Sequence, residues 1–328
     1  MAHVIRINDD LKTYAGLEVC RQLNEAIDEE KICLDISDLG FTAPLGTAMV
    51  GAQIRRLQDR GVRFSVRGYS ENKSSHSYLG HLGFFKLMKI DLGNKPGEAL
   101  GSDAYLPLTV LNKSDLEMDE ILTETSVQEA VRHKAKRLAT VLLQDEEDED
   151  VLKSLSYCFT ELIRNVFEHA GTDECIFMAQ AYRDGRVSIG VVDGGRGLKQ
   201  SLRERHTIEN DMSALQLAIK PGISRQAINA EDQNPWANSG FGLYVLSQLG
   251  KKCGRFDLVS GRASTFLMGS TVRYEDVLYR GTAVGITFDN VRATNLQAKL
   301  QTIIAAGEVE ARSEGRPVRA SRSSHDFS

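Results

Sequence analysis

The sequence predicts a mixed α/β protein made of two structural units. Two patterns support this prediction: short apolar segments typical of strands, and longer segments whose apolar residues recur at helical spacing. The chain has 328 residues, enough for about two domains of ~150 residues each. Its composition, 41% hydrophobic and 26% charged, is that of an ordinary globular protein.

Charge and composition exclude several classes of function. The net charge of -5 is too mild to indicate electrostatic binding to nucleic acid. No run of ~18 apolar residues predicts a transmembrane helix, and residues 1–6 lack the apolar core of a signal peptide. The five cysteines are scattered and form no Cys-x-x-Cys pair. We therefore expect reduced, mostly buried thiols, no membrane contact and a cytoplasmic location.

Residues 1–100 show the alternation of a small α/β unit. Strands are predicted at residues 31–36 and 61–66, and helices at residues 46–57 and around residues 79–85. Met49, Ile54 and Leu57 give the first of these helices an apolar face.

Residues 105–290 form the predicted second unit. Helices are predicted at residues 127–143, 153–170 and 242–250, and strands at residues 106–111, 176–182, 186–192, 256–260, 265–268 and 282–288. The pair Asp184-Gly185 predicts a hairpin between the second and third strands.

Two further segments complete the second unit and the C-terminus. Residues 198–239 are long, polar and irregular, which in a compact domain usually indicates a functional segment such as a lid. A C-terminal helix is expected within residues 291–306, followed by a disordered tail at residues 307–328.

The predicted helix around residue 161 carries an acidic residue and an amide one turn apart. Leu155, Phe159 and Leu162 share an apolar stripe, so Glu161 and Asn165 project from a patch rotated away from it. An Asn carbonyl oxygen suits Mg²⁺, and a glutamate can take a proton from water or a hydroxyl group. Taken alone, the pair fits a solvated helix face better.

An aspartate stands at the end of the buried-looking strand 187–192. Asp193 can accept a hydrogen bond from the exocyclic amine of adenine, and Gly195 and Gly197 allow the backbone to turn sharply and approach a ring. An ordinary Asp-Gly turn explains this segment equally well.

A second glycine turn precedes the helix at residues 242–250. Gly240, Gly242 and Leu243 lie where backbone N–H groups can approach phosphate oxygens, helped by the helix dipole. A flexible loop before a helix is the alternative. The chain contains neither Gly-x-Gly-x-x-Gly at these turns nor a P-loop motif, so dinucleotide-fold and P-loop sites are not favoured.

In this order and spacing, the three segments resemble the GHKL ATPase superfamily, which includes gyrase, heat-shock chaperones, histidine kinases and mismatch-repair ATPases. The resemblance covers roughly residues 105–290 and implies the Bergerat fold, an α/β sandwich that binds ATP and Mg²⁺ beneath a lid. It implies that Glu161 is the catalytic base and Asn165 the Mg²⁺ ligand. The adenine side of the pocket would be formed by Asp193, Gly195, Gly197 and Thr282, and the phosphate side by Gly240, Gly242 and Leu243.

Within that superfamily, the sequence from Thr160 to Ala170, which ends in Glu-His-Ala, resembles anti-sigma-factor Ser/Thr kinases. Those kinases have short lids, whereas residues 198–239 are long. Basic residues of this segment are candidates for a γ-phosphate contact: Arg203, Arg205, Lys220 and Arg225.

Residues 30–90 resemble a STAS domain, the fold of anti-anti-sigma factors. In that family Asp-Ser-Ser-Gly carries a phosphorylated serine, whereas this chain has Ala43-Pro44-Leu45-Gly46. Thr42 and Thr47 flank the position without aligning to it. The resemblance therefore implies a docking or dimerisation surface for a protein partner, and a homodimer is possible.

Three functions follow from these resemblances. The first is a regulatory switch that uses ATP binding and slow hydrolysis to change protein contacts. The second is a Ser/Thr kinase acting on a separate protein, and the third is a binding module whose ATP is structural. A histidine kinase is disfavoured because Lys134, not an acidic residue, follows His133.

Overall fold

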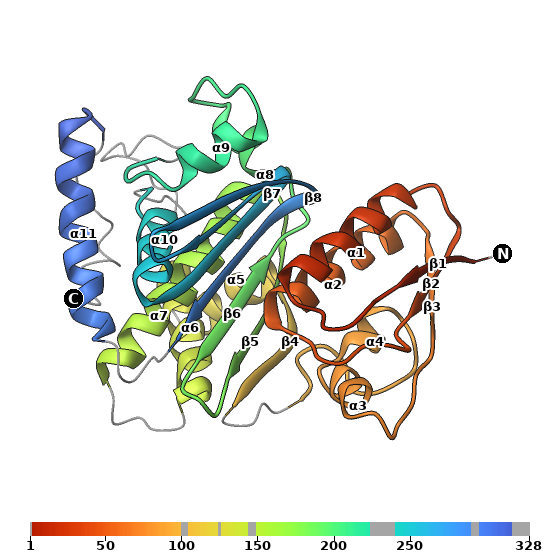
Figure 1. Cartoon of the computed structure of the whole chain (residues 1–328). Coiled ribbons are helices and arrows are strands. Elements are labelled where there is room, and N and C mark those ends of the chain that lie inside the picture. The colour runs from red at the N-terminus through yellow and green to blue at the C-terminus, as the bar shows by residue number, and fades with distance from the viewer. Residues whose placement is uncertain are drawn as a thin grey trace.

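The structure is a computed structural model that describes residues 2–99, 104–123, 126–143, 149–223, 240–289 and 295–316. It contains two sheets (Figure 1). The first is parallel, in the order β1-β2-β3, and the second is antiparallel, in the order β4-β5-β6-β8-β7. The predicted mixed α/β class is thereby confirmed.

The first sheet and its helices form the N-terminal unit. Its strands are β1 (His3–Arg6), β2 (Lys31–Asp35) and β3 (Arg63–Arg67). Its helices are α1 (Thr13–Glu25), α2 (Pro44–Asp59), α3 (Ser74–His81) and α4 (Phe84–Leu87). The two predicted strands and the helix at residues 46–57 are confirmed. No prediction was made for β1 or α1: β1 has only four residues, and Gly16 interrupts the apolar pattern of α1 where it crosses Gly46 of α2.

The second sheet has two long strands where three short ones were predicted. Its strands are β4 (Tyr105–Asn112), β5 (Glu174–Ala181), β6 (Val187–Val192), β7 (Gly254–Met268) and β8 (Thr271–Phe288). The segments at 256–260 and 265–268 are one strand, because Gly261 produces an irregularity in the ladder and not a break. Residues 271–281 were not predicted as a strand, and the start of β8 is exposed and not buried in the sheet's core.

Helices cover one face of this second sheet. They are α5 (Lys113–Thr123), α6 (Val127–Leu143), α7 (Glu149–Asn165), the π-helical turn η1 (Val166–Ala170), α8 (Gly197–Leu202), α9 (Asp211–Ala218) and α10 (Gly242–Cys253). A last helix, α11 (Leu296–Ser313), packs outside this layer on α10 and α7. The predicted stripe of α7 is confirmed, because Leu155, Phe159 and Leu162 are all buried in the core beneath this layer.

Two predictions about these segments were wrong in part. The region after Gly197 is not irregular throughout, since α8 and α9 lie within it. The C-terminal helix continues to Ser313, so residues 307–313 are not disordered. Gly307, which marked the expected end of the helix, instead lets α11 pack closely on Tyr244 of α10: a β-carbon there would lie 2.5 Å from the tyrosine ring.

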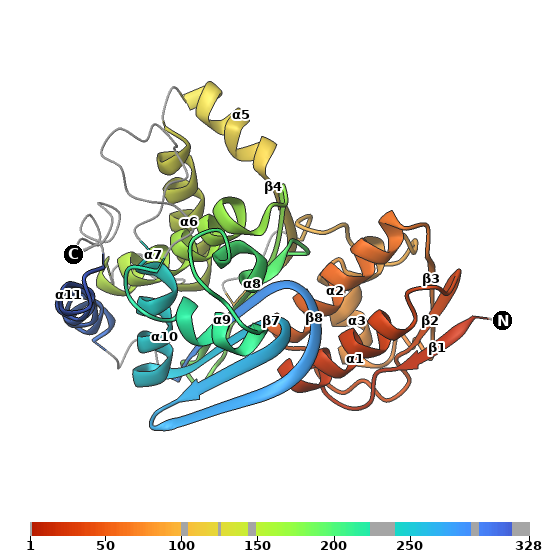
Figure 2. The ribbon, with the colours of Figure 1, turned by 90° about the horizontal axis from the view of Figure 1, so that it is seen from above.

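The opposite face of the second sheet is covered by α1 and α2, so the sheet lies between two helical layers (Figures 1 and 2). The core beneath these helices joins both units, because Ile176, Met178 and Val259 of the second sheet pack in the same cluster as Leu17 and Met49 of the N-terminal helices. The sheets fall on either side of the predicted boundary near residue 100, but the hydrophobic core crosses it.

The start of α2 packs against two glycines of the second sheet. Gly190 of β6 and Gly285 of β8 face each other in the ladder. A β-carbon at Gly190 would lie 2.6 Å from the Cα of Leu45, and one at Gly285 would lie 2.6 Å from the Cδ2 atom of Leu45. This glycine notch lets the backbone of α2 approach the sheet directly.

Over the residues described, none of the helices is sufficiently long and apolar to cross a membrane.

Candidate functional site

One pocket of the described structure gathers residues from all three predicted site segments. Its lining includes Asn165 of α7, Asp193 after β6, Gly197 of α8, Leu243 of α10 and Thr282 of β8. The empty space, its open mouth included, is about 410 Å³. Much of the remaining wall is apolar: Leu162, Val166, Val191, Leu198 and Val284.

Asp193 is the carboxylate of this pocket and is only 3% exposed. Its Oδ1 atom accepts hydrogen bonds from the backbone N–H groups of Gly195, at 2.8 Å, and Thr282, at 3.2 Å. The Thr282 hydroxyl also bonds to the carboxyl group. Three donors thus fix a carboxylate inside an apolar wall.

Burial raises the pKa of Asp193 to about 7, although the hydrogen bonds from Gly195 and Thr282 act in the opposite direction. Two other titratable groups face it, the thiol of Cys175 on β5 and the phenol of Tyr279 on β8, and burial raises the pKa of both. A carboxyl group with a perturbed pKa inside a pocket is a common mark of a functional site.

A π-helical turn shapes the pocket beside Asp193. Asn165 is the last residue of α7, and η1 follows it directly and ends at Ala170, after which Gly171 has a φ of 65°. Such turns occur frequently at functional sites. The carbonyl oxygen of Ala170, the last residue of η1, accepts a hydrogen bond of 2.8 Å from the backbone N–H of Arg196. The helix that carries Asn165 is thereby tied to the turn that carries Asp193.

The two glycines after Asp193 have different roles. Gly195 was expected at the adenine side of the pocket, but it does not belong to the lining. A β-carbon at Gly195 would lie 2.1 Å from the carbonyl oxygen of Ala170, so the absence of a side chain there allows η1 to approach. Gly197 does line the pocket and has a φ of 75°. Next to it, the Ser260 hydroxyl accepts a 2.9 Å hydrogen bond from the N–H of Leu198 and donates one of 2.9 Å to the carbonyl of Gly281.

Glu161 lies behind the pocket and does not belong to its lining. Its side chain is 1% exposed, and its Oε1 atom lies 3.8 Å from the Nη1 atom of Arg164. Arg164 also donates to Glu168 at 3.0 Å. Burial lowers the pKa of Arg164, but the charges of Glu161 and Glu168 outweigh it, so the net shift is upward. The expected base is therefore part of a buried ionic group.

Two of the predicted phosphate-side glycines serve packing. A β-carbon at Gly242 would lie 2.2 Å from the Oε2 atom of Glu161, which places that carboxylate against the first turn of α10. Gly240, with a φ of 75°, packs on the backbone of Ile223, and its carbonyl accepts a 3.1 Å bond from the N–H of Gly222. The chain segments on either side of residues 224–239 therefore meet.

None of the candidate γ-phosphate contacts that the structure describes, Arg203, Arg205 and Lys220, belongs to the pocket lining. The guanidinium of Arg203 donates to the carbonyl of Ile208 at 3.3 Å, and the residues Arg205 and Lys220 are exposed. Arg225 lies outside the described residues, as does the rest of the predicted lid from residue 224 to residue 239.

Sequence reasoning missed Ser260, Tyr279 and Arg164. The first two support the Asp193 turn from other strands, and no local pattern marks them. Arg164 did carry a local signal, since it lies three residues after Glu161 on the same helix.

No protein-family model matches this chain, and no curated protein or solved structure does so either.

Proposed function

We propose that this protein binds ATP with Mg²⁺ and uses nucleotide occupancy to regulate contacts with a protein partner. The observation that carries the proposal is Asp193, a fixed carboxylate at an apolar pocket wall with Asn165 in the same lining. Apolar walls suit a purine ring, and a carboxylate distinguishes a base that has an exocyclic amine.

The pocket residues fit Mg²⁺ in one respect. In the described part of the chain no group of three or more His, Cys, Asp or Glu side chains could hold a metal ion. Mg²⁺ bound with a nucleotide needs only one or two protein oxygens beside phosphates and waters. The amide oxygen of Asn165 is such a ligand, and the ion would neutralise phosphate charge there.

We assign residues 105–290 to a GHKL-like ATP-binding unit and residues 1–100 to a STAS-like unit as part of this proposal. The antiparallel sheet with α7 and α10 on one face supports the first assignment. In the STAS-like unit the flanking hydroxyl residues are buried, Thr42 at 1% and Thr47 at 0% exposed, and Leu45 occupies the glycine notch. This burial supports a docking role for the unit over a phosphate-acceptor role.

Turnover would be slow in this proposal, because Glu161 is held by Arg164 and covered by Gly242. The same observation favours a second candidate, a module that holds ATP without hydrolysing it.

Glu161→Gln separates the two: it leaves nucleotide affinity within about threefold, and it abolishes phosphate release only if Glu161 is the base. Phosphate release that persists in Glu161→Gln would exclude this residue as the base. Transfer of labelled γ-phosphate to another protein would instead identify a kinase.

The binding proposal is tested by calorimetry on Asp193→Asn. Asparagine keeps one oxygen for the N–H groups of Gly195 and Thr282 but replaces the other carboxylate oxygen with an NH₂ group. The loss of a charge-assisted hydrogen bond predicts an ATP affinity at least about tenfold lower.

The matched control is Asp257→Asn. Asp257 is another buried aspartate of the same sheet, 6% exposed, and it bonds to Thr13 of α1 away from the pocket. ATP affinity should not change in this variant. Equal affinities in the Asp193 variant and the wild type would remove the basis of the proposed function.

A further inference from the structure

The support of Asp193 continues through strand β8 into the N-terminal unit. Ser260 pairs with Thr282 and Gly261 with Tyr279, so Arg280 and Gly281 form a bulge outside the ladder. Gly281 has a φ of 105°, and a β-carbon there would lie 2.1 Å from the carbonyl oxygen of Asp193. Bulges frequently lie beside active sites, where they redirect a side chain.

On the side of the N-terminal unit, buried amides hold this bulge. Gln53 of α2 is 0% exposed and donates a 2.9 Å hydrogen bond to the carbonyl of Arg280. Asn24 of α1 donates to the carbonyl of Leu278 at 3.3 Å. Arg56 orients both amides, with bonds of 2.7 Å to the Oδ1 atom of Asn24 and 3.2 Å to the Oε1 atom of Gln53. A buried amide is costly unless its bonds are made, so these side chains define one arrangement of the bulge.

On the pocket side, the same segment holds both the backbone and the carboxylate of Asp193. The fully buried Tyr279 donates its hydroxyl proton to the carbonyl of Asp193 at 3.2 Å. The backbone N–H of Thr282 donates to the Oδ1 atom of Asp193 at 3.2 Å, and the Thr282 carbonyl accepts from the Asp193 N–H at 2.9 Å. The Tyr279 hydroxyl also bonds to Gln53. Two hydrogen bonds therefore connect α2 with Asp193.

We infer that Gln53 and Tyr279 are positioning residues for the purine-reading carboxylate, and that the N-terminal unit is thereby part of the nucleotide site. The inference rests on the proposed function and deepens it. A partner that displaces α2 changes purine affinity through the bulge, and by linkage nucleotide binding changes the affinity for that partner equally.

The test compares ATP with purine riboside triphosphate, which lacks the 6-amino group. The wild type binds ATP more tightly, because only ATP offers a donor to Asp193. Tyr279→Phe and Gln53→Met each remove polar atoms of the connection at nearly constant volume. Each lowers the ATP preference at least about threefold, toward the value of Asp193→Asn. A purely structural role would lower stability and leave this preference unchanged.

Thr13→Val is the matched control. The Thr13 hydroxyl also joins the N-terminal unit to the second sheet, with a 3.2 Å bond to the Oδ2 atom of Asp257, but it does not touch the bulge. This variant should keep the full ATP preference. If Gln53→Met fails to fold, Tyr279→Phe, which loses a single oxygen, decides alone. An unchanged preference in a folded Tyr279→Phe protein overturns the inference.

A second measurement separates this inference from the proposed function. If the wild type binds neither nucleotide, the proposed function fails, and the pKa of Asp193 measured by carboxyl ¹³C NMR then tests the positioning role. Tyr279→Phe shifts this pKa by at least about half a unit because it moves the backbone that places Gly195 and Thr282 around the carboxylate. An unmoved pKa overturns the inference in that case also.

Discussion

At the scale of single residues, Asp193 has two opposing tasks. The apolar wall that suits a purine ring also destabilises the negative charge of the Asp193 carboxylate, which would contact that ring. For this reason burial raises the pKa of the Asp193 carboxyl group to about 7. A ligand that donates a hydrogen bond favours the ionised form. Nucleotide binding and deprotonation of Asp193 are therefore expected to assist each other.

The affinity for ATP should accordingly increase with pH. With a pKa of about 7, the ionised fraction of Asp193 rises about tenfold between pH 6 and pH 8. Calorimetry across this range should show a comparable gain in affinity. Asp193→Asn controls for the titration of the phosphates, because it removes only the contribution of the carboxyl group. Identical pH profiles in the two proteins would contradict the assignment.

The same raised pKa affects stability in the opposite direction. An unfolded aspartate titrates near pH 4, so between about pH 4 and pH 7 the folded state holds the extra proton and loses stability as pH rises. At pH 8 the full cost is present, and Asp193→Asn should be more stable than the wild type by roughly 4 kcal/mol, because each of the about three pKa units between the folded and unfolded states costs about 1.4 kcal/mol. Urea unfolding at pH 5 and pH 8 checks this, since the difference should shrink at the lower pH.

At the scale of secondary-structure elements, the contact between η1 and the turn after β6 is set by a missing side chain. Gly195→Ala places a methyl group against the carbonyl of Ala170 at 2.1 Å, and the two elements must separate. We expect a loss of about 2 kcal/mol or more in stability, together with weakened ATP binding.

Gly194→Ala is the neighbouring control, because a β-carbon there meets nothing within 4 Å. Thermal unfolding should distinguish the two variants, and equal effects would exclude the close approach as the cause.

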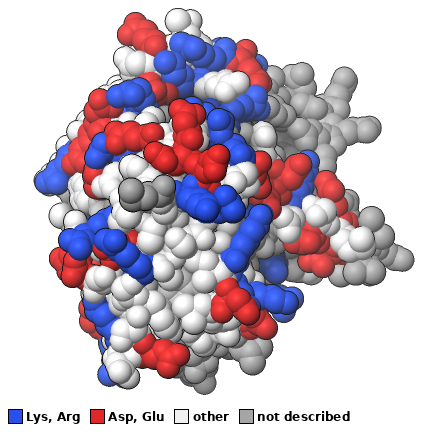
Figure 3. All heavy atoms as spheres, turned by 90° about the vertical axis from the view of Figure 1, so that its right-hand side faces the viewer, with Lys and Arg blue, Asp and Glu red and all other residues white. Residues whose placement is uncertain are grey.

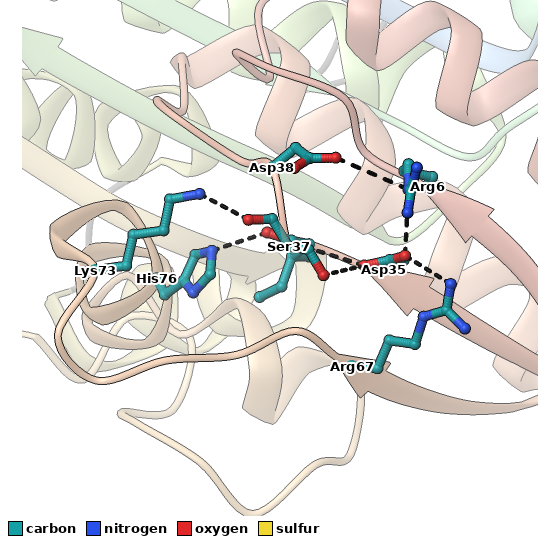
Figure 4. A network of polar contacts seen from close by, with 8 residues as sticks. Arg6, Asp35, Ser37, Asp38, Arg67, Lys73 and His76 are labelled. Atoms are coloured by element: carbon teal, nitrogen blue, oxygen red, sulfur yellow. Dashed lines mark hydrogen bonds and ion pairs between the residues drawn. The ribbon is translucent and has the colours of Figure 1, made fainter.

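A second element-scale feature is the polar network at the carboxyl ends of the parallel strands (Figure 4). Asp35 pairs in register with Arg6 and Arg67 and accepts bonds from both, at 3.3 and 2.7 Å. The Ser37 hydroxyl, at 2.6 Å, and then Arg67 hold the pKa of Asp35 well below its usual range, despite burial of its side chain. The network joins the ends of all three strands.

Acid unfolding tests this network. A depressed pKa adds stability above the unfolded value of about 4, and that stability is lost as pH falls further. The wild type should therefore lose stability more steeply below pH 4 than Asp35→Asn, with chemical unfolding as the measurement. Asp38→Asn, at an exposed residue 3.9 Å from Arg6, should keep the wild-type profile.

At the scale of the whole molecule, the second sheet serves both helical layers. Because Ile176, Met178 and Val259 pack against the N-terminal helices, the core on this side of the sheet belongs to both units, whereas the core on its other face is formed by the second unit. On the outward face of the N-terminal unit both signs of charge are mixed around a largely uncharged area (Figure 3), and no single-sign field predicts a highly charged partner.

Calorimetric unfolding should consequently show one transition. Removing residues 1–100 would expose the apolar face of the sheet, so that fragment should aggregate or fail to fold. Two separated transitions in the full chain would mean that the shared core does not couple the units.

The sequence could predict features that depend on neighbours along the chain. The stripe of α7, the strand before Asp193 and the hairpin at Asp184-Gly185 all follow from local periodicity or turn chemistry. The meeting of Asn165, Asp193 and Thr282 in one pocket came from the resemblance and not from periodicity. The burial of Glu161 against Gly242, the support of Asp193 by Tyr279 and the continuation of β7 through Gly261 depend on contacts between distant segments, which spacing does not reveal.

The glycine notch under Leu45 offers a way to vary the attachment of the layers without touching the pocket. Neither Gly190 nor Gly285 belongs to the pocket lining, yet a methyl group on either strand would act as a wedge against α2. Substituting alanine and then serine there would weaken the packing of α2 on the sheet step by step. The side chains that line the pocket would remain unchanged. Such a series of variants would vary in steps how firmly the N-terminal helices are attached to the second sheet.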